Sequence, residues 1–260
     1  MKIIVLKSSS VFRFVCFCLF FAVIISVSRF FTVQTDAKET FSSSCGRSLP
    51  IYSVQTQEKK AAIGINCAWD DRDIPQILQT LREHNTQATF FLLGEWAEKY
   101  PLSAKAITDA GHEIGSHSYS HRDMDCLSQQ EILEEIRSSQ TAIETVCGKK
   151  PILFRPPSGS YNDLVIDSIH SCGCIPIQWN LDTLDWKGLS AEQIAERVSS
   201  RLSCGSILLL HSGADFSAQS LPLILEQADD CGFSFVPVGE LLLPNSKQVD
   251  HEGRQLPCES

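Results

Sequence analysis

The stretch AAIGINCAWDDRDIPQILQTLREHNTQATFFLLG, residues 61–94, decides the fold of this chain. It begins with a strand-like apolar run over residues 61–69. Apolar residues between 74 and 81 then recur at i, i+3, i+4 and i+7, which is the spacing of one helix face. A second apolar run follows over residues 88–94, so the stretch predicts two parallel strands joined by a helix.

The same alternation continues through most of the chain. Two capping boxes mark helix starts, at Ser128-Gln-Gln-Glu131 and Ser190-Ala-Glu-Gln193. Other helices are expected over about 96–110, 162–172 and 220–232. Strands are expected over residues 61–69, 88–94, 112–116, 152–154, 175–179, 206–210 and 233–238. Seven strands with intervening helices predict an α/β fold with a parallel sheet that is closed or nearly closed.

An uncharged apolar segment, FVCFCLFFAVIISVS over residues 14–28, lies between Arg13 and Arg29. A basic region followed by an apolar core of about 7–15 residues is typical of a secretory signal. No clean A-x-A cleavage site follows, so residues 1–35 are expected to be a signal peptide or an uncleaved membrane anchor. Because both flanks are basic, a buried core helix is disfavoured. The body is therefore expected outside the cytoplasm, secreted or anchored on the outer face of the cytoplasmic membrane.

Polar, aperiodic stretches flank the repeating body. Residues 36–59 are predicted to be a linker, and residues 246–260 a loose tail. Between them, residues 60–245 are predicted to form a single domain.

The charge of the chain is acidic and unevenly distributed. The whole chain has 22 Lys and Arg against 31 Asp and Glu, a net charge of −9. Outside residues 1–37 there are 18 basic and 30 acidic residues. Nucleic acid is not expected as a partner, since its recognition relies on Lys and Arg at the phosphates. A neutral polysaccharide remains compatible with this charge.

The cysteines do not identify a function. Nine of them lie outside the apolar segment, an odd number, and their spacings fit no zinc-finger pattern. Cys67, Cys174 and Cys204 lie in or beside strand-like runs and are interpreted as small core residues. Cys45 and Cys258 flank the body, but the sequence does not decide whether they pair.

Polar residues follow five of the predicted strands. In closed parallel α/β folds, chemistry collects at the carboxyl ends of the strands. The polar groups at these ends lie within residues 66–73, 117–121, 155–161 and 182–186 and at His211. The sequence therefore predicts one functional rim.

His117 and His121 are the most specific feature of this rim. Two imidazoles four residues apart share a face if one helical turn separates them, and such a pair suits Zn²⁺ or another divalent metal. Three carboxylates after the first strand, Asp70, Asp71 and Asp73, are the expected partners of the pair. The positions of Arg155 and His211 at strand ends favour a role in the site over a structural role.

On four ordered motifs the chain resembles the NodB-type polysaccharide deacetylases (carbohydrate esterase family 4), in the branch of small exported and sporulation-associated bacterial members. The resemblance covers residues of about 60–243. His117-Ser118-Tyr119-Ser120-His121 matches H-[ST]-x-x-H, and Arg155-Pro156-Pro157-Ser158-Gly159 matches R-x-P-x-G. Asp185-Trp186 matches the fourth motif, and Leu208-Leu209-Leu210-His211 matches L-x-L-H.

The resemblance implies a distorted seven-stranded (β/α) barrel, the NodB-homology domain, that removes N- or O-acetyl groups from glycans with a divalent metal. Zn²⁺ is the expected ion, with Co²⁺ as an alternative. His117, His121 and one aspartate would bind the metal, which makes a bound water acidic enough to attack at neutral pH. His211 would be the general acid.

The remaining roles are also implied only by the resemblance. Arg155 and Asp185 would hold and tune the catalytic base. The backbone N–H of Tyr161 would complete the oxyanion site. Trp186 and Leu208 would line the acetyl pocket.

The first motif departs from the pattern of the family. The family has T-F-D-D, with a base aspartate followed by a metal-binding aspartate, but these positions are Asn66 and Cys67 here. Branches with the form A-W-x-x-x-D place the metal carboxylate later, which nominates Asp73 and leaves Asp70 and Asp71 as candidates. An amide cannot accept a proton from metal-bound water, and loss of a general base costs about 10²–10⁴-fold in rate.

Three functional hypotheses follow. The leading one is metal-dependent deacetylation of an N-acetylated glycan, peptidoglycan or chitooligosaccharide-like, slowed by Asn66 unless Asp70 or Asp71 replaces the base. The second is a catalytically inactive protein of the cell surface that binds metal and glycan. The third is an unrelated metallohydrolase on a similar barrel, such as an amidase.

Overall fold

The computed structural model describes residues 48–246 and 248–258, and the statements below concern these residues. The apolar segment over residues 14–28 and Cys45 lie outside them, so the signal peptide or anchor stays a prediction. Within the described ranges, no helix is both long and apolar enough to cross a membrane.

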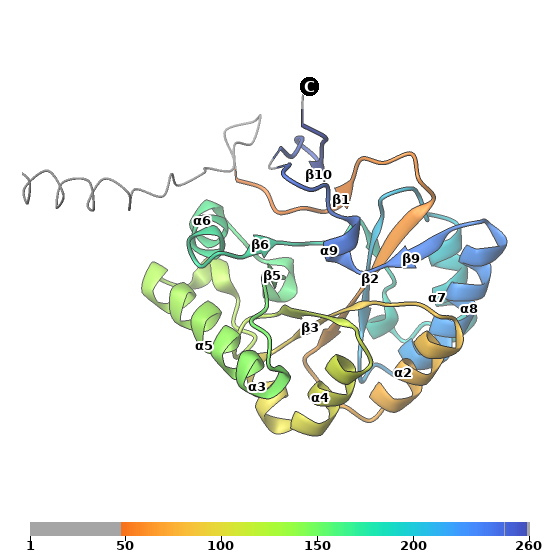
Figure 1. Ribbon diagram of the computed structural model, residues 1–260, viewed down its shortest axis with the longest axis horizontal. Helices are drawn as coiled ribbons and strands as arrows, with labels where there is room; N and C mark the ends of the chain where they lie inside the picture. Colours follow the sequence, from red (N-terminus) through yellow and green to blue (C-terminus); the bar gives the residue numbers. More distant parts are fainter. Residues whose placement is uncertain (1–47, 247, 259–260) are drawn as a thin grey trace, which may run out of the picture. The chain divides into compact units, whose positions relative to one another are not determined.

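A curved parallel sheet forms the centre of the body (Figure 1). Its strands follow the order β6-β5-β4-β3-β2-β8-β7, and β9 pairs with the first residues of β2. The strands are β2 (Lys60–Cys67), β3 (Thr89–Leu92), β4 (Glu113–Ser116), β5 (Leu153–Phe154), β6 (Ile175–Pro176), β7 (Leu181–Asp182), β8 (Ile207–His211) and β9 (Ser234–Val236). The predicted α/β fold with a parallel sheet is confirmed.

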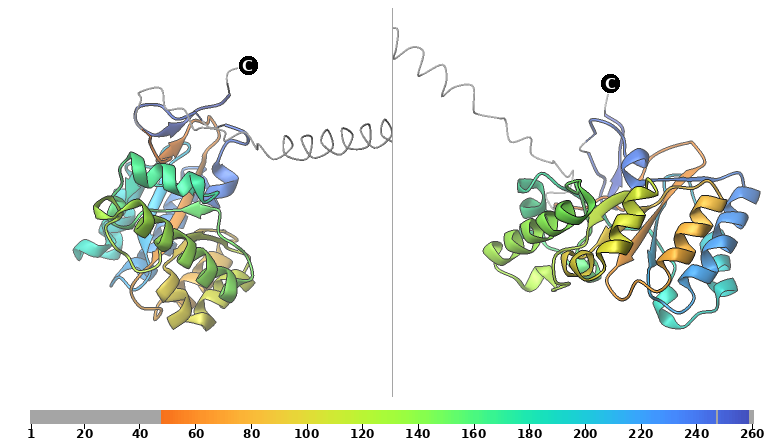
Figure 2. Two further views of the ribbon diagram at one scale, coloured as in Figure 1. Left: turned by 90° about the vertical axis from the view of Figure 1, so that its left-hand side faces the viewer. Right: turned by 60° about the horizontal axis from the view of Figure 1, so that its bottom comes forward.

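Helices surround the outside of this sheet (Figures 1 and 2). They are α2 (Ile74–Glu83), α3 (Gly94–Lys99), α4 (Pro101–Asp109), α5 (Gln129–Cys147), α6 (Asp163–Ser171), α7 (Ala191–Ser199), α8 (Ser217–Asp230) and α9 (Val238–Leu241). Three short 3-10 turns are η1 (Met124–Cys126), η2 (Pro157–Gly159) and η3 (Asp185–Lys187). Both predicted capping boxes are present, at the starts of α5 and α7.

Strand β2 shows how the sheet separates core from site. Its side chains alternate between the two faces of the sheet. Ile63 and Ile65 belong to the main hydrophobic core beneath the helices. Ala62 belongs to a second cluster, and Asn66 contacts the polar residues described below. The apolar face of β2 therefore anchors the strand, while its other face carries an amide to the rim.

The helix predicted over 96–110 is two helices, α3 and α4. Tyr100 separates them, and Pro101 is the first residue of α4. Proline has no N–H to continue the preceding helix, but it fits the first position of a new one. The break is therefore a consequence of Pro101.

The barrel is open rather than closed. Strands β6 and β7 are the two edges of the sheet, although they are neighbours in sequence. The strand predicted over 175–179 is therefore wrong beyond Ile177, because the following residues lead from one edge to the other. Ile51 pairs with Ile177, and the N–H of Val54 donates to Gly205 O at 2.9 Å. The segment before β2 thus links the end of β6 to the residues that precede β8.

The predicted linker and loose tail are both wrong for the residues that the structure describes. Strand β1 (Ser53–Val54), from the linker, pairs in parallel with β10 (Arg254–Gln255), from the tail. Ile51, Val54 and Val249 are buried in one hydrophobic cluster with Phe91. The folded body therefore begins earlier and ends later than predicted, because these short segments bury apolar side chains that the alternating pattern does not contain.

Two of the three predicted core cysteines are buried. Cys67 and Cys174 are 0% and 2% exposed, whereas Cys204 is partly exposed. Cys258 is an exposed free thiol in the described part of the chain.

Candidate active site

The polar residues predicted at the strand ends converge on one hollow. A cavity of about 430 Å³ opens there. Its lining comprises Asn66, Ala68, Trp69, His117, His121, Ser158, Trp179, Asp182, Trp186, Leu209 and His211. A larger hollow of about 650 Å³ is lined mainly by residues of α2 and α4 and contains none of the predicted site residues. The smaller cavity is the candidate site, because its lining contains Asn66 and the three predicted site histidines.

Asn66 is the centre of a closed ring of hydrogen bonds. Its Oδ1 accepts from Nη1 of Arg155 at 3.0 Å, and its Nδ2 lies 3.2 Å from Nε2 of His117. Nδ1 of His117 lies 2.7 Å from the backbone oxygen of Arg155. The three side chains are 3%, 1% and 0% exposed, in the order Asn66, His117 and Arg155. The ring is therefore sealed from solvent on most sides.

Arg155 is a buried cation. Its guanidinium also donates to Gly64 O and Gln178 O, and none of its hydrogen bonds in the described chain goes to a carboxylate. The group lies 4.0 Å from the ring centre of Phe91, and burial lowers the pKa of Arg155 to about 9. Gly64 makes room for it, since a Cβ there would lie 2.8 Å from Nη1.

His117 and His121 are brought together by a loop and not by a helical turn. Their ring centroids are 5.1 Å apart and the rings meet edge to face. Ser118 and His121 both have positive φ, 72° and 63°, which L-residues rarely adopt. Strained backbone of this kind clusters at functional sites. Burial first, and then the neighbouring His121, hold the pKa of His117 well below its ordinary value.

Glu135 of α5 holds this loop, a role that the sequence did not reveal. Its Oε2 accepts from the backbone N–H of Tyr119 and of Ser120 at 3.0 and 2.9 Å, and its Oε1 accepts from the Ser120 hydroxyl at 2.6 Å. Glu135 is 7% exposed. The signal available in the sequence was a charged residue between the apolar residues Ile132 and Ile136 of the same helix.

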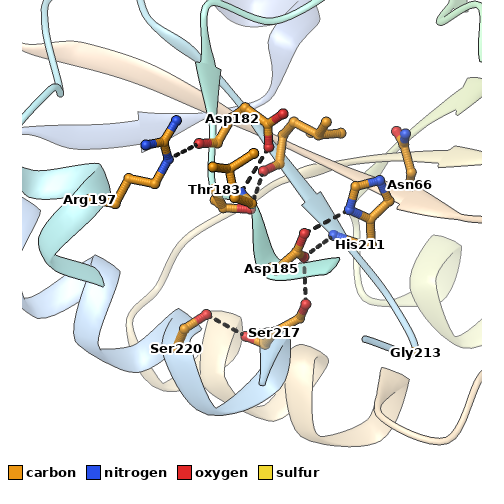
Figure 3. A network of polar contacts seen from close by, with 12 residues as sticks. Asn66, Asp182, Thr183, Asp185, Arg197, His211, Gly213, Ser217 and Ser220 are labelled. Carbon is orange, nitrogen blue, oxygen red and sulfur yellow. Dashed lines mark hydrogen bonds and ion pairs between the residues drawn. The ribbon is translucent and has the colours of Figure 1, made fainter. Parts of the chain in front are cut away.

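On the other side of the cavity, Asp185 holds His211 (Figure 3). Asp185 Oδ1 lies 2.8 Å from Nδ1 of His211, and Oδ2 accepts from the His211 N–H at 2.7 Å and the Ser217 hydroxyl at 2.6 Å. Burial by itself raises the pKa of Asp185, but the hydrogen bonds from His211 and Ser217 outweigh it and lower the pKa. The carboxylate therefore fixes the ring orientation of His211.

The structure does not bring Asp73 together with the histidine pair. Asp73 Oδ2 accepts from the Gly213 N–H at 2.8 Å, and its Oδ1 has no hydrogen-bond partner among the described residues. Burial raises the pKa of Asp73. Asp70 pairs with Arg72, and Asp71 accepts from the Ser103 hydroxyl. Asp70, Asp71 and one oxygen of Asp73 are thus directed to partners other than the histidines.

These residues do not fit a metal centre of the expected composition. Among residues 48–246 and 248–258, no three His, Cys, Asp or Glu side chains are grouped as metal ligands. The Nε2 atom of His117 faces the Asn66 amide, and Cys67, the other changed position, is buried in the main core. The prediction that Asp73 completes a site with His117 and His121 is not supported by this arrangement.

One of the predicted substrate contacts changes. Leu208 belongs to the main core, and Leu209 lines the cavity instead, because alternate strand residues face opposite sides. The Tyr161 hydroxyl lies 3.0 Å from the hydroxyl of Tyr52, and the role of the Tyr161 backbone N–H stays a prediction. Trp186 lines the cavity as predicted.

Trp69 and Trp179 line the cavity although the sequence did not single them out. Trp69 stacks on His211 with ring centroids 5.1 Å apart, and Trp179 lies 5.6 Å from the Arg155 guanidinium. With Trp186, three of the four tryptophans of the chain meet at one hollow. Trp69 and Trp179 are the last residues of two predicted strands, and this position was the available signal.

Comparisons with known proteins agree with this architecture. Residues 53–176 match the polysaccharide deacetylase family model. A peptidoglycan-N-acetylglucosamine deacetylase of Bacillus cereus is 33% identical over 196 residues, which cover 74% of this chain and 92% of that protein. The uncharacterized protein YlxY of Bacillus subtilis is 36% identical over 193 residues, 74% of this chain, which spans only 60% of YlxY.

A solved structure extends the comparison to three dimensions. BA3943 of Bacillus anthracis, described as a CE4 family pseudoenzyme, has a TM-score of 0.73 and 32% identity over 78% of this chain and 73% of that one. A BA3943 mutant, with a TM-score of 0.72, is described as having restored enzymatic activity. The fold, the rim and these relatives lead to one conclusion: this chain belongs to the polysaccharide deacetylase family.

Proposed function

We propose that this protein binds an N-acetylated cell-wall glycan in the tryptophan-lined cavity and hydrolyses it slowly or not at all. One observation carries the proposal: three tryptophans line a cavity in which Asn66 occupies the position expected for the catalytic base. The cavity is retained, while the proton acceptor is replaced.

The binding half of the proposal rests on the aromatic walls. Pyranose rings present C–H groups on their faces, and an acetyl group adds a methyl, so both pack well against indole rings. Trp69 and Trp186 are 48% and 50% exposed, which leaves apolar surface for a ligand to cover. A volume of about 430 Å³ is within the range of about 300–1,000 Å³ typical of ligand pockets.

The catalytic half rests on Asn66. A carboxamide does not accept a proton at neutral pH, and the hydrogen bonds of Asn66 orient its N–H toward His117. Among the described residues no carboxylate takes its place at His117, because Asp70, Asp71 and Asp73 contact other groups. The pseudoenzyme description of BA3943 supports this proposal.

The relatives suggest the glycan. Several are named peptidoglycan deacetylases, and one is a chitooligosaccharide deacetylase. A neutral N-acetylated chain also suits an acidic body that would repel polyanions. We propose an extracytoplasmic location as well, from the apolar segment over residues 14–28 between basic flanks.

A second candidate function is a divalent-metal-dependent deacetylase acting on the same glycans. The retained Asp185–His211–Ser217 group favours it, because an imidazole held by a carboxylate is suited to proton transfer. In this case His211 would protonate the departing amine.

The test uses the full-length protein with soluble N-acetylglucosamine oligomers and muropeptides. We expect saturable quenching of tryptophan fluorescence, and no loss of acetyl groups by mass spectrometry with or without Zn²⁺ or Co²⁺. Trp186→Ala should weaken binding at least about tenfold, since aromatic side chains that a ligand covers dominate binding energies. Leu102→Ala, on exposed α4 surface away from the cavity, is the matched control and should bind like the wild type.

Three outcomes would contradict the proposal. Absence of binding would show that these glycans are not ligands of the cavity. Rapid acetyl loss by the wild type would favour the deacetylase. Release of peptides instead of acetyl groups would support the amidase hypothesis. Fully N-deacetylated oligomers serve as the ligand control, measured at high salt so that their positive charge is screened.

A further inference from the structure

The hydrogen bonds around Asn66 determine which atom of its carboxamide faces Arg155 and which faces His117. The Arg155 guanidinium has only donors, so the atom of Asn66 that meets it must be the carbonyl oxygen. The amide nitrogen is then the atom that faces His117. The orientation of this carboxamide is thus set by its neighbours and not by an arbitrary choice between oxygen and nitrogen.

The same reasoning determines the tautomer of His117. The backbone oxygen of Arg155 is only an acceptor, so the Nδ1 atom that lies 2.7 Å away carries the hydrogen. Nε2 of the neutral ring then has the lone pair, and the Asn66 N–H donates into it at 3.2 Å. This lone pair is the one that a metal ion would need.

We infer that the Asn66 carboxamide replaces a metal ion at His117, so that the site is preorganised without metal. The ring of three hydrogen bonds, from Arg155 to Asn66 to His117 and back to the backbone of Arg155, holds each group in place. The inference goes beyond the proposed function, because it describes the protein before any glycan binds.

The substitution Asn66→Asp would have the opposite effect. The new carboxylate would keep the hydrogen bond from Arg155, but its second oxygen would face the lone pair of His117. Two acceptors at this distance repel each other, and only a proton or a metal cation between them relieves the repulsion. The carboxylate would also give the buried Arg155 a counter-charge, which the described hydrogen bonds do not provide.

The experiment measures metal binding directly, without any glycan. Full-length wild type, Asn66→Asp and Asn66→Ser are titrated with ZnCl₂, and again with CoCl₂, by isothermal titration calorimetry. Each is compared with the same protein carrying His121→Ala, because free thiols also bind these ions. His121 is exposed, so its truncation does not threaten folding.

We expect the wild type to show no equivalent of metal that depends on His121. Asn66→Asp should gain one such equivalent, which is lost again when His121→Ala is added. Asn66→Ser removes the amide without adding a carboxylate. It should bind a His121-dependent equivalent of metal more weakly than Asn66→Asp does. The imidazole ¹⁵N spectrum of the wild type should show His117 as the Nδ1–H tautomer, unchanged by metal.

Two results would overturn the inference. One is a His121-dependent equivalent in the wild type with the affinity seen in Asn66→Asp. The other is Asn66→Ser behaving like the wild type while Asn66→Asp binds, since a missing carboxylate alone would then explain the difference. Either result is independent of glycan binding, so failure here is distinguishable from failure of the proposed function.

Discussion

Asparagine and aspartate have nearly the same shape, and at position 66 the difference between them is one of hydrogen-bond direction. The amide can serve as donor to His117 and acceptor from Arg155 at once. A carboxylate offers two acceptors and needs a cation at one of them. A single side chain therefore decides whether this rim is closed by internal hydrogen bonds or requires a ligand.

Asp185 shows the effect of a single residue on pH dependence. Its pKa is lowered in the folded protein, whereas the unfolded value is about 3.9. The stabilisation is therefore fully present above about pH 4 and is lost as the pH falls through the folded pKa. We expect Asp185→Asn to lower the urea midpoint at pH 6 by more than it does at pH 3.

Urea unfolding at the two pH values measures this effect. Ser217→Ala, which removes one of the hydrogen bonds to the carboxylate, should show the same trend with a smaller difference. An equal effect of Asp185→Asn at both pH values would show that the ionised carboxylate adds no stability.

At the scale of elements, the two-residue strand β10 matters more than its length suggests. Its Gln255 is 2% exposed. The Gln255 amide donates to Ser246 O at 2.9 Å, and its oxygen accepts from the Leu243 N–H at 2.8 Å. The neighbouring Arg254 is exposed. The Gln255 side chain thus provides hydrogen-bond partners for backbone groups, whereas the Arg254 side chain faces solvent.

This difference predicts different costs for two adjacent substitutions. Gln255→Ala leaves buried backbone groups without partners, which costs about 1–3 kcal/mol of unfolding free energy. Arg254→Ala, the matched control, should stay within about 0.5 kcal/mol of the wild type. Chemical denaturation of both variants checks the prediction, and equal stabilities would show that β10 is only loosely attached.

At the scale of the whole molecule, the open barrel depends on chain that precedes its first sheet strand. Residues 51–54 pair with Ile177 after β6 and with the residues before β8, and they bury Ile51 and Val54. The same segment pairs with β10 near the end of the chain. The described residues of the predicted linker and tail are therefore part of one folded body.

Truncation tests this arrangement. A chain that begins at residue 48 should melt within a few degrees of the full-length protein. A chain that begins at residue 57 loses the burial of Ile51 and Val54, on the order of 3–6 kcal/mol, and should melt roughly 10 °C lower or more. Thermal unfolding by circular dichroism measures both, and equal melting temperatures would restore the predicted boundary at residue 60.

The sequence by itself determined the class of fold and the location of the site. Alternating apolar periods identify strands and helices because they reflect which faces are buried, and parallel strands bring their carboxyl ends to one edge. Asn66, His117, His121, Asp185, His211 and Trp186 were all predicted to share this rim. The capping boxes at Ser128 and Ser190 are also local, so the sequence is sufficient for them.

Only the tertiary structure decided which side chains partner which. It placed Asp73 against Gly213 instead of the histidines, and it put Leu209 rather than Leu208 at the cavity. It also brought Glu135 to the histidine loop and turned the Asn66 amide toward His117. These are contacts between residues far apart in the chain, and no local pattern encodes them, because their geometry depends on how several elements pack at once.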